Sequence, residues 1–175
     1  MKQILFALFL VSPALAWAES GPIDGTFVYV GGDSQKQAQL KAINDATAGM
    51  FPMAVPIARK KLTERNPVPP RVQIRVAHGR VTFLDGGTPA VSGADGSSLT
   101  FISTKGERVT LQQKLEGKTM TQSFATREGA RQNRFVLAED EKTLTEQVTI
   151  TSPKLPRPIA YTLTYTREAT ETASR

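Results

Sequence analysis

The residues that usually carry enzyme chemistry are sparse in this chain. His78 is the single histidine and there is no cysteine, so the sequence lacks the ligand set of a typical zinc site. His78 also precedes Gly79 between two predicted strands, which is typical of a turn residue. The sequence contains no nucleophile elbow, phosphate-binding glycine loop or paired metal motif. It therefore predicts a non-enzyme with no catalytic residue, no metal site and no cofactor.

A second group of polar residues alternates in phase with apolar ones along residues 109–148: Gln113, Gln122, Arg131, Asn133 and Glu146. In regular strands these side chains point to the apolar side of the sheet. A buried Arg or Glu without a partner is costly, so these residues must pair, bind water or line a cavity. Two hypotheses follow. Either Arg131 and nearby tyrosines hold the polar group of a ligand, or Arg131 reaches solvent at a strand end and a bulge turns Glu146 outward.

The strands that carry these residues are separated by three turn signals, at residues 116–117, 128–129 and 139–142. Antiparallel pairing then places Leu111 opposite Gln122, Gln122 opposite Phe135, and Phe135 opposite Glu146. All the apolar residues stay on one face, and the other face is rich in Thr and Gln. Because a slip of one residue inverts a strand, this agreement favours a meander with one solvated face.

The first half of the chain changes period. Residues 25–30 form a short β run, and residues 34–49 and 53–64 are predicted helices separated by Pro52, which cannot continue a helix. Their apolar positions are Leu40, Ile43, Met50, Ala54, Ile57 and Leu62. Alternation resumes at residue 71, and after a loop rich in Gly, Ser and Asp it includes Leu99 and Phe101. The fold class is therefore mainly β with an inserted helical pair, a barrel or half-barrel whose antiparallel up-and-down meander has about 8 to 10 strands.

The ends of the chain predict export and a single domain. Lys2, an apolar run and small residues at Ala16 and Ala18 form a signal peptide over residues 1–18. We expect one β-rich domain over residues 19–167, a flexible tail over residues 168–175, and no transmembrane anchor after cleavage. The protein is then periplasmic or secreted. Its formal net charge of +6 favours solubility and permits contact with an anionic surface.

This order of elements resembles the calycin superfamily of lipocalins and fatty-acid-binding proteins, above all the latter. Gly25-Thr26-Phe27 stands where that family typically has Gly-Thr-Trp, and the last strand bears Tyr165 and Arg167. The resemblance implies a barrel with an internal pocket for an apolar molecule and places Tyr165 and Arg167 near its head group. An open, curved sheet with a helix across its concave side, as in periplasmic carriers of lipoprotein acyl chains, is a similar arrangement.

The leading hypothesis is an exported, soluble protein that binds or carries a small apolar, lipid-like ligand in a barrel cavity. The alternative is a non-catalytic envelope module that binds a protein or an anionic surface polymer, for example through the basic stretch Arg59-Lys60-Lys61 with Arg65, Arg71 and Arg75. Nucleic acid is not expected, since no aromatic residues interleave with that stretch. The predicted ligand-binding residues are Gln113, Gln122, Phe124, Arg131, Asn133, Phe135, Glu146, Tyr161 and Tyr165, with Phe83 and Phe101 completing the lining.

Overall fold

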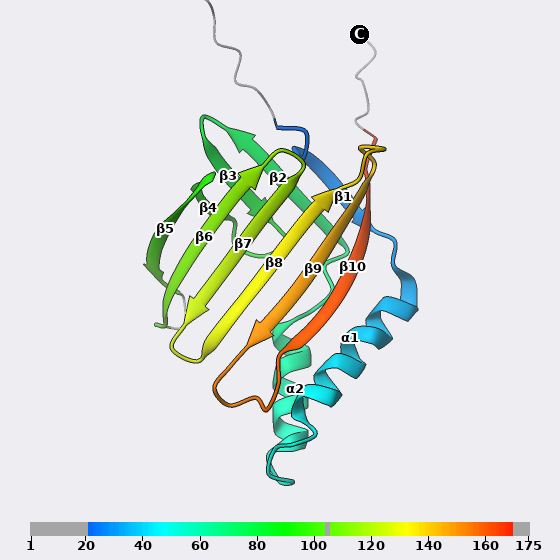
Figure 1. The fold of residues 1–175 in the computed structure, drawn as a ribbon, viewed down its shortest axis with the longest axis vertical. Coiled ribbons are helices and arrows are strands. Elements are labelled where there is room, and N and C mark those ends of the chain that lie inside the picture. Colours follow the sequence, from blue (N-terminus) through cyan, green and yellow to red (C-terminus); the bar gives the residue numbers. More distant parts are fainter. Residues whose placement is uncertain (1–20, 104–105, 170–175) are drawn as a thin grey trace, which may run out of the picture.

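The computed structural model describes residues 21–103 and 106–169; the predicted signal peptide and residues 170–175 of the predicted tail lie outside this part. The described chain is mainly β, with two helices inserted after the first strand (Figure 1). The elements are β1 (Gly25–Tyr29), α1 (Gly32–Thr47), α2 (Val55–Arg65), β2 (Arg71–Ala77), β3 (Arg80–Leu84), β4 (Ala90–Gly93), β5 (Asp95–Ile102), β6 (Arg108–Glu116), β7 (Thr119–Thr126), β8 (Gly129–Leu137), β9 (Thr143–Thr151) and β10 (Ile159–Arg167). The predicted fold class is confirmed.

The ten strands form one antiparallel sheet in the order β4-β3-β2-β1-β10-β9-β8-β7-β6-β5. The first strand pairs with the last, so that Phe27 lies opposite Arg167. The two edges of the sheet belong to consecutive strands, and the chain passes from one to the other at Ala94. There Ala94 donates to the Gly79 carbonyl and accepts from the Leu115 amide, both at 2.9 Å. The sheet is therefore a nearly closed barrel, joined at this corner.

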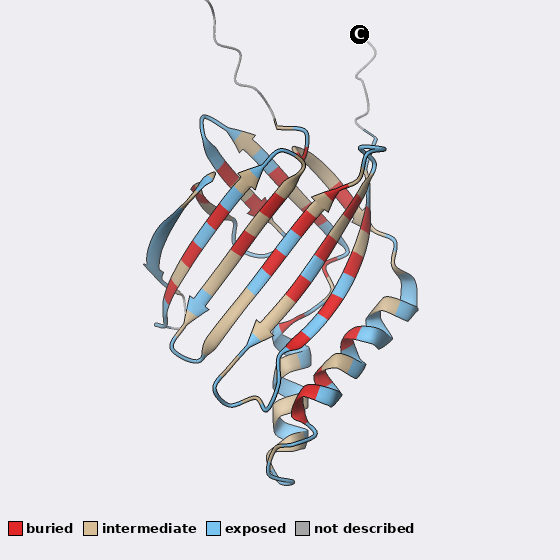
Figure 2. Cartoon of the chain, viewed as in Figure 1, coloured by how far each residue is buried: buried red, intermediate tan, exposed pale blue. Residues whose placement is uncertain are grey.

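The inner face of the barrel carries the core, and burial alternates along most strands (Figure 2). Phe135 is fully buried and its ring lies 5.1 Å from that of Phe83. The predicted registry is right for Phe135 and Glu146, but Gln122 pairs with Gln113 and Asn133 rather than with Leu111 and Phe135. Each error is two residues, which leaves every side chain on its predicted face because the strand repeat is also two.

One strand departs from the predicted pattern. Leu99 and Phe101 of β5 are 44% and 39% exposed, and Ile102 is 62% exposed. Within the described ranges this strand has only β6 as a ladder partner, and a register shift between Asp95 and Ser98 interrupts that pairing. An edge strand with a bulge twists away from the sheet, so the predicted burial of Leu99 and Phe101 is wrong in degree. The short strand β4 lies within the segment predicted to be a loop.

The helical pair lies at one end of the barrel, with α1 beside β10 (Figure 1). Gln35 of α1 bonds both the side chain and the amide of Thr164 in β10, each at 2.8 Å. The buried face of α1 is formed by Gln39, Ile43, Ala46 and Thr47. Leu40 and Ile57 are 43% and 58% exposed, so their predicted place on the apolar face is wrong. The buried face of α1 includes Gln39, the residue before Leu40, instead of Leu40 itself.

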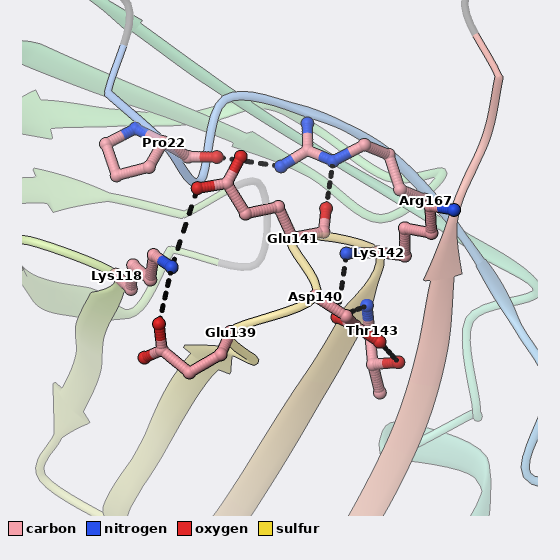
Figure 3. Close-up of polar contacts among 8 residues, drawn as sticks. All are labelled: Pro22, Lys118, Glu139, Asp140, Glu141, Lys142, Thr143 and Arg167. Atoms are coloured by element: carbon pink, nitrogen blue, oxygen red, sulfur yellow. Dashed lines mark hydrogen bonds and ion pairs between the residues drawn. The ribbon is translucent and has the colours of Figure 1, made fainter.

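Arg167, the last residue of β10, connects separate segments of the chain at one end of the barrel (Figure 3). Its guanidinium donates to the carbonyls of Glu141 and Pro22, each at 2.7 Å, and to that of Asp24. The same group stacks over the Phe27 ring, 4.7 Å from its centroid. Gly25 makes room for it, because a Cβ there would lie 2.3 Å from Arg167 Nη1. Arg167 thus links the start of the described chain to the β8–β9 turn.

Candidate functional site

Five adjacent strands carry the nine predicted binding residues. Strand β6 supplies Gln113; β7 supplies Gln122 and Phe124; β8 supplies Arg131, Asn133 and Phe135; β9 supplies Glu146; and β10 supplies Tyr161 and Tyr165. Seven of these residues are buried, whereas Phe124 and Arg131 are half-buried. The structure therefore brings the predicted polar residues to the inner face; their binding of a ligand stays a prediction.

Arg131 is the hub of this polar network. Its Nε donates to Asn133 Oδ1 at 2.8 Å, its Nη1 to Asn66 Oδ1 at 3.1 Å, and its Nη2 to Glu146 Oε1 at 3.4 Å. The Arg131 side chain is 24% exposed and that of Glu146 only 2%. The ion pair is consequently screened from solvent mainly on the carboxylate side. The buried Glu146 is therefore paired with Arg131, as the sequence required of a buried charge. The hypothesis that a bulge turns Glu146 outward is wrong.

Glu146 is held by two donors. Besides Arg131, Tyr165 OH donates to Glu146 Oε2 at 3.1 Å. Burial raises the pKa of the Glu146 carboxyl, and the Arg131 charge and the Tyr165 hydrogen bond oppose that rise. Burial also raises the pKa of the Tyr165 phenol, and the neighbouring Glu146 carboxylate raises it further. With each carboxylate oxygen accepting a hydrogen bond, the geometry fits the ionised form.

The network continues along β8 and β7 through two amides. Asn133 Nδ2 donates to Gln122 Oε1 at 3.0 Å, and Gln122 Nε2 has no hydrogen-bond partner among the described residues. Gln113, which faces Gln122 across the ladder, accepts from Ser92 Oγ at 2.8 Å. Tyr161 OH is likewise buried without a partner in the described chain. Since buried polar groups are normally bonded, these atoms mark positions for water or a ligand.

A pocket of about 200 Å³ adjoins the network. Its lining combines the apolar residues Phe83, Phe101 and Phe124 with the polar residues Asp85, Gln122, Arg131 and Asn133. Ala90 of β4 and Phe101 of β5 both line it, so it lies where the two sheet edges face each other. Ligand pockets usually span about 300–1,000 Å³, which makes this a small one.

Sequence reasoning missed three residues of the site. Asn66 directly follows the last residue of α2 and was not predicted to belong to the site; Gln39 donates to its carbonyl at 2.7 Å. Ser92 lies on the unpredicted strand β4 and is 3% exposed. A polar residue on the buried face of a helix was a usable signal for Gln39. The partners of Asn66 and Ser92 are 65 and 21 residues away, a separation that no local pattern reveals.

Other predicted candidates lie elsewhere. Arg167, which the resemblance placed near a head group, is at the barrel end described above and is not part of the polar network. In the basic stretch, Arg59 donates to Thr47 Oγ1 at 3.2 Å, Lys60 lies 3.9 Å from Glu64, and Arg71 pairs with Glu168. His78 is an exposed turn residue with a φ of 51°, as its sequence position indicated.

Within the described ranges, no cluster of three or more His, Cys, Asp or Glu residues is placed to hold a metal ion. No helix among residues 21–103 and 106–169 is long and apolar enough to span a membrane.

Comparison with solved structures identifies the architecture. Lipid binding protein 8 of Caenorhabditis elegans superposes with a TM-score of 0.53 at 11% identity, over 84% of this chain and 96% of that one. The chain has a fatty-acid-binding-protein-like fold. Fatty-acid-binding protein 1 of Echinococcus granulosus (TM-score 0.48, 13% identity, 85% and 98% coverage) and the brain fatty-acid-binding protein of Drosophila melanogaster (0.49, 12%, 83% and 99%) are also similar. No protein-family model and no curated protein matches the sequence. The predicted resemblance to the calycin superfamily is confirmed at the level of the fold.

Proposed function

We propose that this protein is a non-catalytic carrier that binds a small, lipid-like ligand in its barrel. The observation that carries the proposal is a pocket lined by both aromatic and polar side chains, set at the junction of the sheet edges. A site of this kind suits an amphipathic molecule, since the apolar part gains about 0.8 kcal/mol for each buried CH₂. The shared fold with a lipid binding protein supports the same function.

In this proposal the ligand lies with its apolar part against Phe83, Phe101 and Phe124. Its polar end meets Gln122, Asn133 and Arg131, which line the same pocket. The volume of about 200 Å³ restricts the ligand to a short chain or compact molecule. Phe101 is 39% exposed on an edge strand, so entry between β4 and β5 requires only a small movement of this residue.

A single introduced tryptophan tests the proposal. The sequence has one Trp, Trp17, inside the predicted signal peptide, so Phe101→Trp creates the only indole of the processed chain. We expect saturable, blue-shifted emission when a short-chain lipid is added. Phe51→Trp is the matched control, because Phe51 is 72% exposed beyond α1.

Equal responses from the two reporters would indicate non-specific adsorption. No saturable response from Phe101→Trp, together with a native mass equal to the bare chain after purification from the host, would refute the carrier function. Salt-sensitive association with an anionic polymer would then favour the interaction module instead.

We further propose that the protein is exported, on the basis of residues 1–18 alone. Amino-terminal sequencing of the protein from fractionated host cells tests this, and we expect it to begin at Glu19 outside the cytoplasm. An intact Met1 in the cytoplasmic fraction would contradict export without affecting the carrier proposal.

A further inference from the structure

The hydrogen-bond polarity of the network is fixed by Arg131. A guanidinium can only donate, so the Asn133 atom that faces Arg131 Nε at 2.8 Å must be the carbonyl oxygen. The amide nitrogen of Asn133 then faces Gln122, and the atom that it meets at 3.0 Å must be Gln122 Oε1. Gln122 Nε2 is thereby left as a donor. It is buried, has no partner in the described chain, and belongs to a residue that lines the pocket.

Arg131 is already paired with one acidic residue, and Asp85, a second acidic residue, also lines the pocket. The Arg131 guanidinium pairs with Glu146 Oε1 at 3.4 Å, and Tyr165 OH occupies Glu146 Oε2 at 3.1 Å. An anionic ligand at Arg131 would bring a further negative charge toward the carboxylate of Glu146, whose side chain is only 2% exposed. Two carboxylates sharing one guanidinium in a poorly solvated site are unfavourable. A neutral acceptor does not incur this cost.

From these two observations we propose that the ligand presents an uncharged hydrogen-bond acceptor, the carbonyl of an ester, amide, ketone or aldehyde, to Gln122 Nε2. This inference rests on the proposed carrier function and specifies its ligand class. It separates the protein from a carrier of free carboxylates, whose ionised group needs an unpaired cation. Among the described residues, Arg131 is the only cation that lines the pocket, and it is committed to Glu146, Asn133 and Asn66.

Matched ligands test the inference. A short-chain methyl ester, the alkyl sulfonate of equal chain length and the corresponding alkane are titrated into the Phe101→Trp protein. We expect the ester to bind more tightly than both. Gln122→Leu lowers ester affinity by about two- to tenfold, the usual effect of one hydrogen bond, and leaves alkane affinity unchanged. Gln112→Leu is the control, since Gln112 is exposed on the outer face of β6 and bonds Ser98.

Removing the negative charge of Glu146 is the second test. Glu146→Gln frees Arg131, so sulfonate affinity rises by about tenfold or more while ester affinity changes little. If this variant does not fold, acidification of the wild-type protein replaces it, because burial places the pKa of Glu146 above its ordinary value. The sulfonate stays ionised, so its affinity relative to the ester rises as pH falls. The other ionisable groups near Glu146 are Arg131, Tyr165, Tyr161 and Asp85.

The outcomes separate the two proposals. If ester, sulfonate and alkane all fail to bind, the carrier function is overturned, and the ligand class with it. If the sulfonate binds wild-type protein as tightly as the ester, or Gln122→Leu weakens the ester no more than Gln112→Leu does, the carrier function stands and the neutral-acceptor inference is overturned. If the ratio of sulfonate affinity to ester affinity changes neither in Glu146→Gln nor with pH, the neutral-acceptor inference is also overturned.

Discussion

Asn66 Oδ1 accepts a hydrogen bond from Arg131 Nη1 at 3.1 Å, and this contact joins the end of α2 to the polar network of the barrel. The same residue donates from Nδ2 to the Leu62 carbonyl at 2.7 Å, which caps α2, and accepts from Gln39 of α1 through its own carbonyl. Asn66 therefore links both helices to the polar network of the barrel.

Replacing Asn66 tests this connection. We expect Asn66→Ala to lower the free energy of unfolding by about 1–3 kcal/mol, since it leaves buried partners unsatisfied. Hydrogen exchange in α2 should accelerate more than in β8. The control, Asn44→Ala, changes an exposed residue of α1 and should shift stability by less than about 0.5 kcal/mol. Equal effects of the two changes would contradict the connection.

Glu146 gives stability a defined pH dependence. Its pKa is raised in the folded protein, so the unfolded chain loses this proton at lower pH than the folded one. The contribution of Glu146 to the free energy of unfolding is therefore complete below the ordinary Glu pKa. It is lost as pH rises through the raised pKa of Glu146 in the folded protein. Urea unfolding of wild-type protein and Glu146→Gln over that range should show the decline only in the wild type.

Tyr165→Phe extends this experiment. Removing the hydroxyl that donates to Glu146 Oε2 raises the pKa of Glu146 further, because the ionised form loses a hydrogen bond. The decline in stability should then continue to higher pH. A decline that ends at the same pH in both proteins would show that the hydroxyl does not stabilise the carboxylate.

Phe135 is expected to be the most sensitive of the aromatic residues near the site. It is fully buried and packs on Phe83, so Phe135→Ala should destabilise the fold by about 3–5 kcal/mol. Phe51→Ala, at a residue that is 72% exposed, should cost less than about 0.5 kcal/mol. Denaturant midpoints of the two variants make the comparison, and similar midpoints would contradict the packing.

The barrel end depends on the shape of Arg167 as well as its charge. Arg167→Lys keeps the charge but cannot reach the Pro22, Asp24 and Glu141 carbonyls together, because lysine lacks the planar fork. We expect a loss of about 1–3 kcal/mol and faster hydrogen exchange in β1. Arg134→Lys, on the exposed face of β8, serves as the control and should be silent.

Much of the fold could be predicted because the strand repeat is tolerant of error. Moving Gln122 by two positions relative to its neighbours changed its partners but not its face, so the inward set was right although two pairings were wrong. The break between the two helices followed from Pro52, which acts locally. Pro56 lies within the first two positions of α2, where its missing amide is not needed. Edge position has no such local signature, and for that reason the exposure of Leu99 and Phe101 was not predicted.

The sequence predicted which residues belong to the candidate site, but not which of their atoms form hydrogen bonds with one another. Alternation identified Arg131, Asn133, Gln122 and Glu146 as inward residues, and the need to satisfy a buried Arg predicted that they pair. Which atoms pair depends on the relative placement of separate strands. The link to Asn66 depends on where a helix ends in space, and that follows only from the assembled barrel.

The pairing of β1 with β10 has a consequence for the way the chain folds. The contact between Phe27 and Arg167 joins segments at opposite ends of the domain, so most of the chain must be ordered before the sheet can complete itself. Such long-range contacts raise the contact order and slow folding relative to helical proteins of the same size. During synthesis β1 can pair with β2 early, but it lacks its second neighbour until β10 has been made. Closure of the barrel is therefore a late step of folding, because it waits for the last strand.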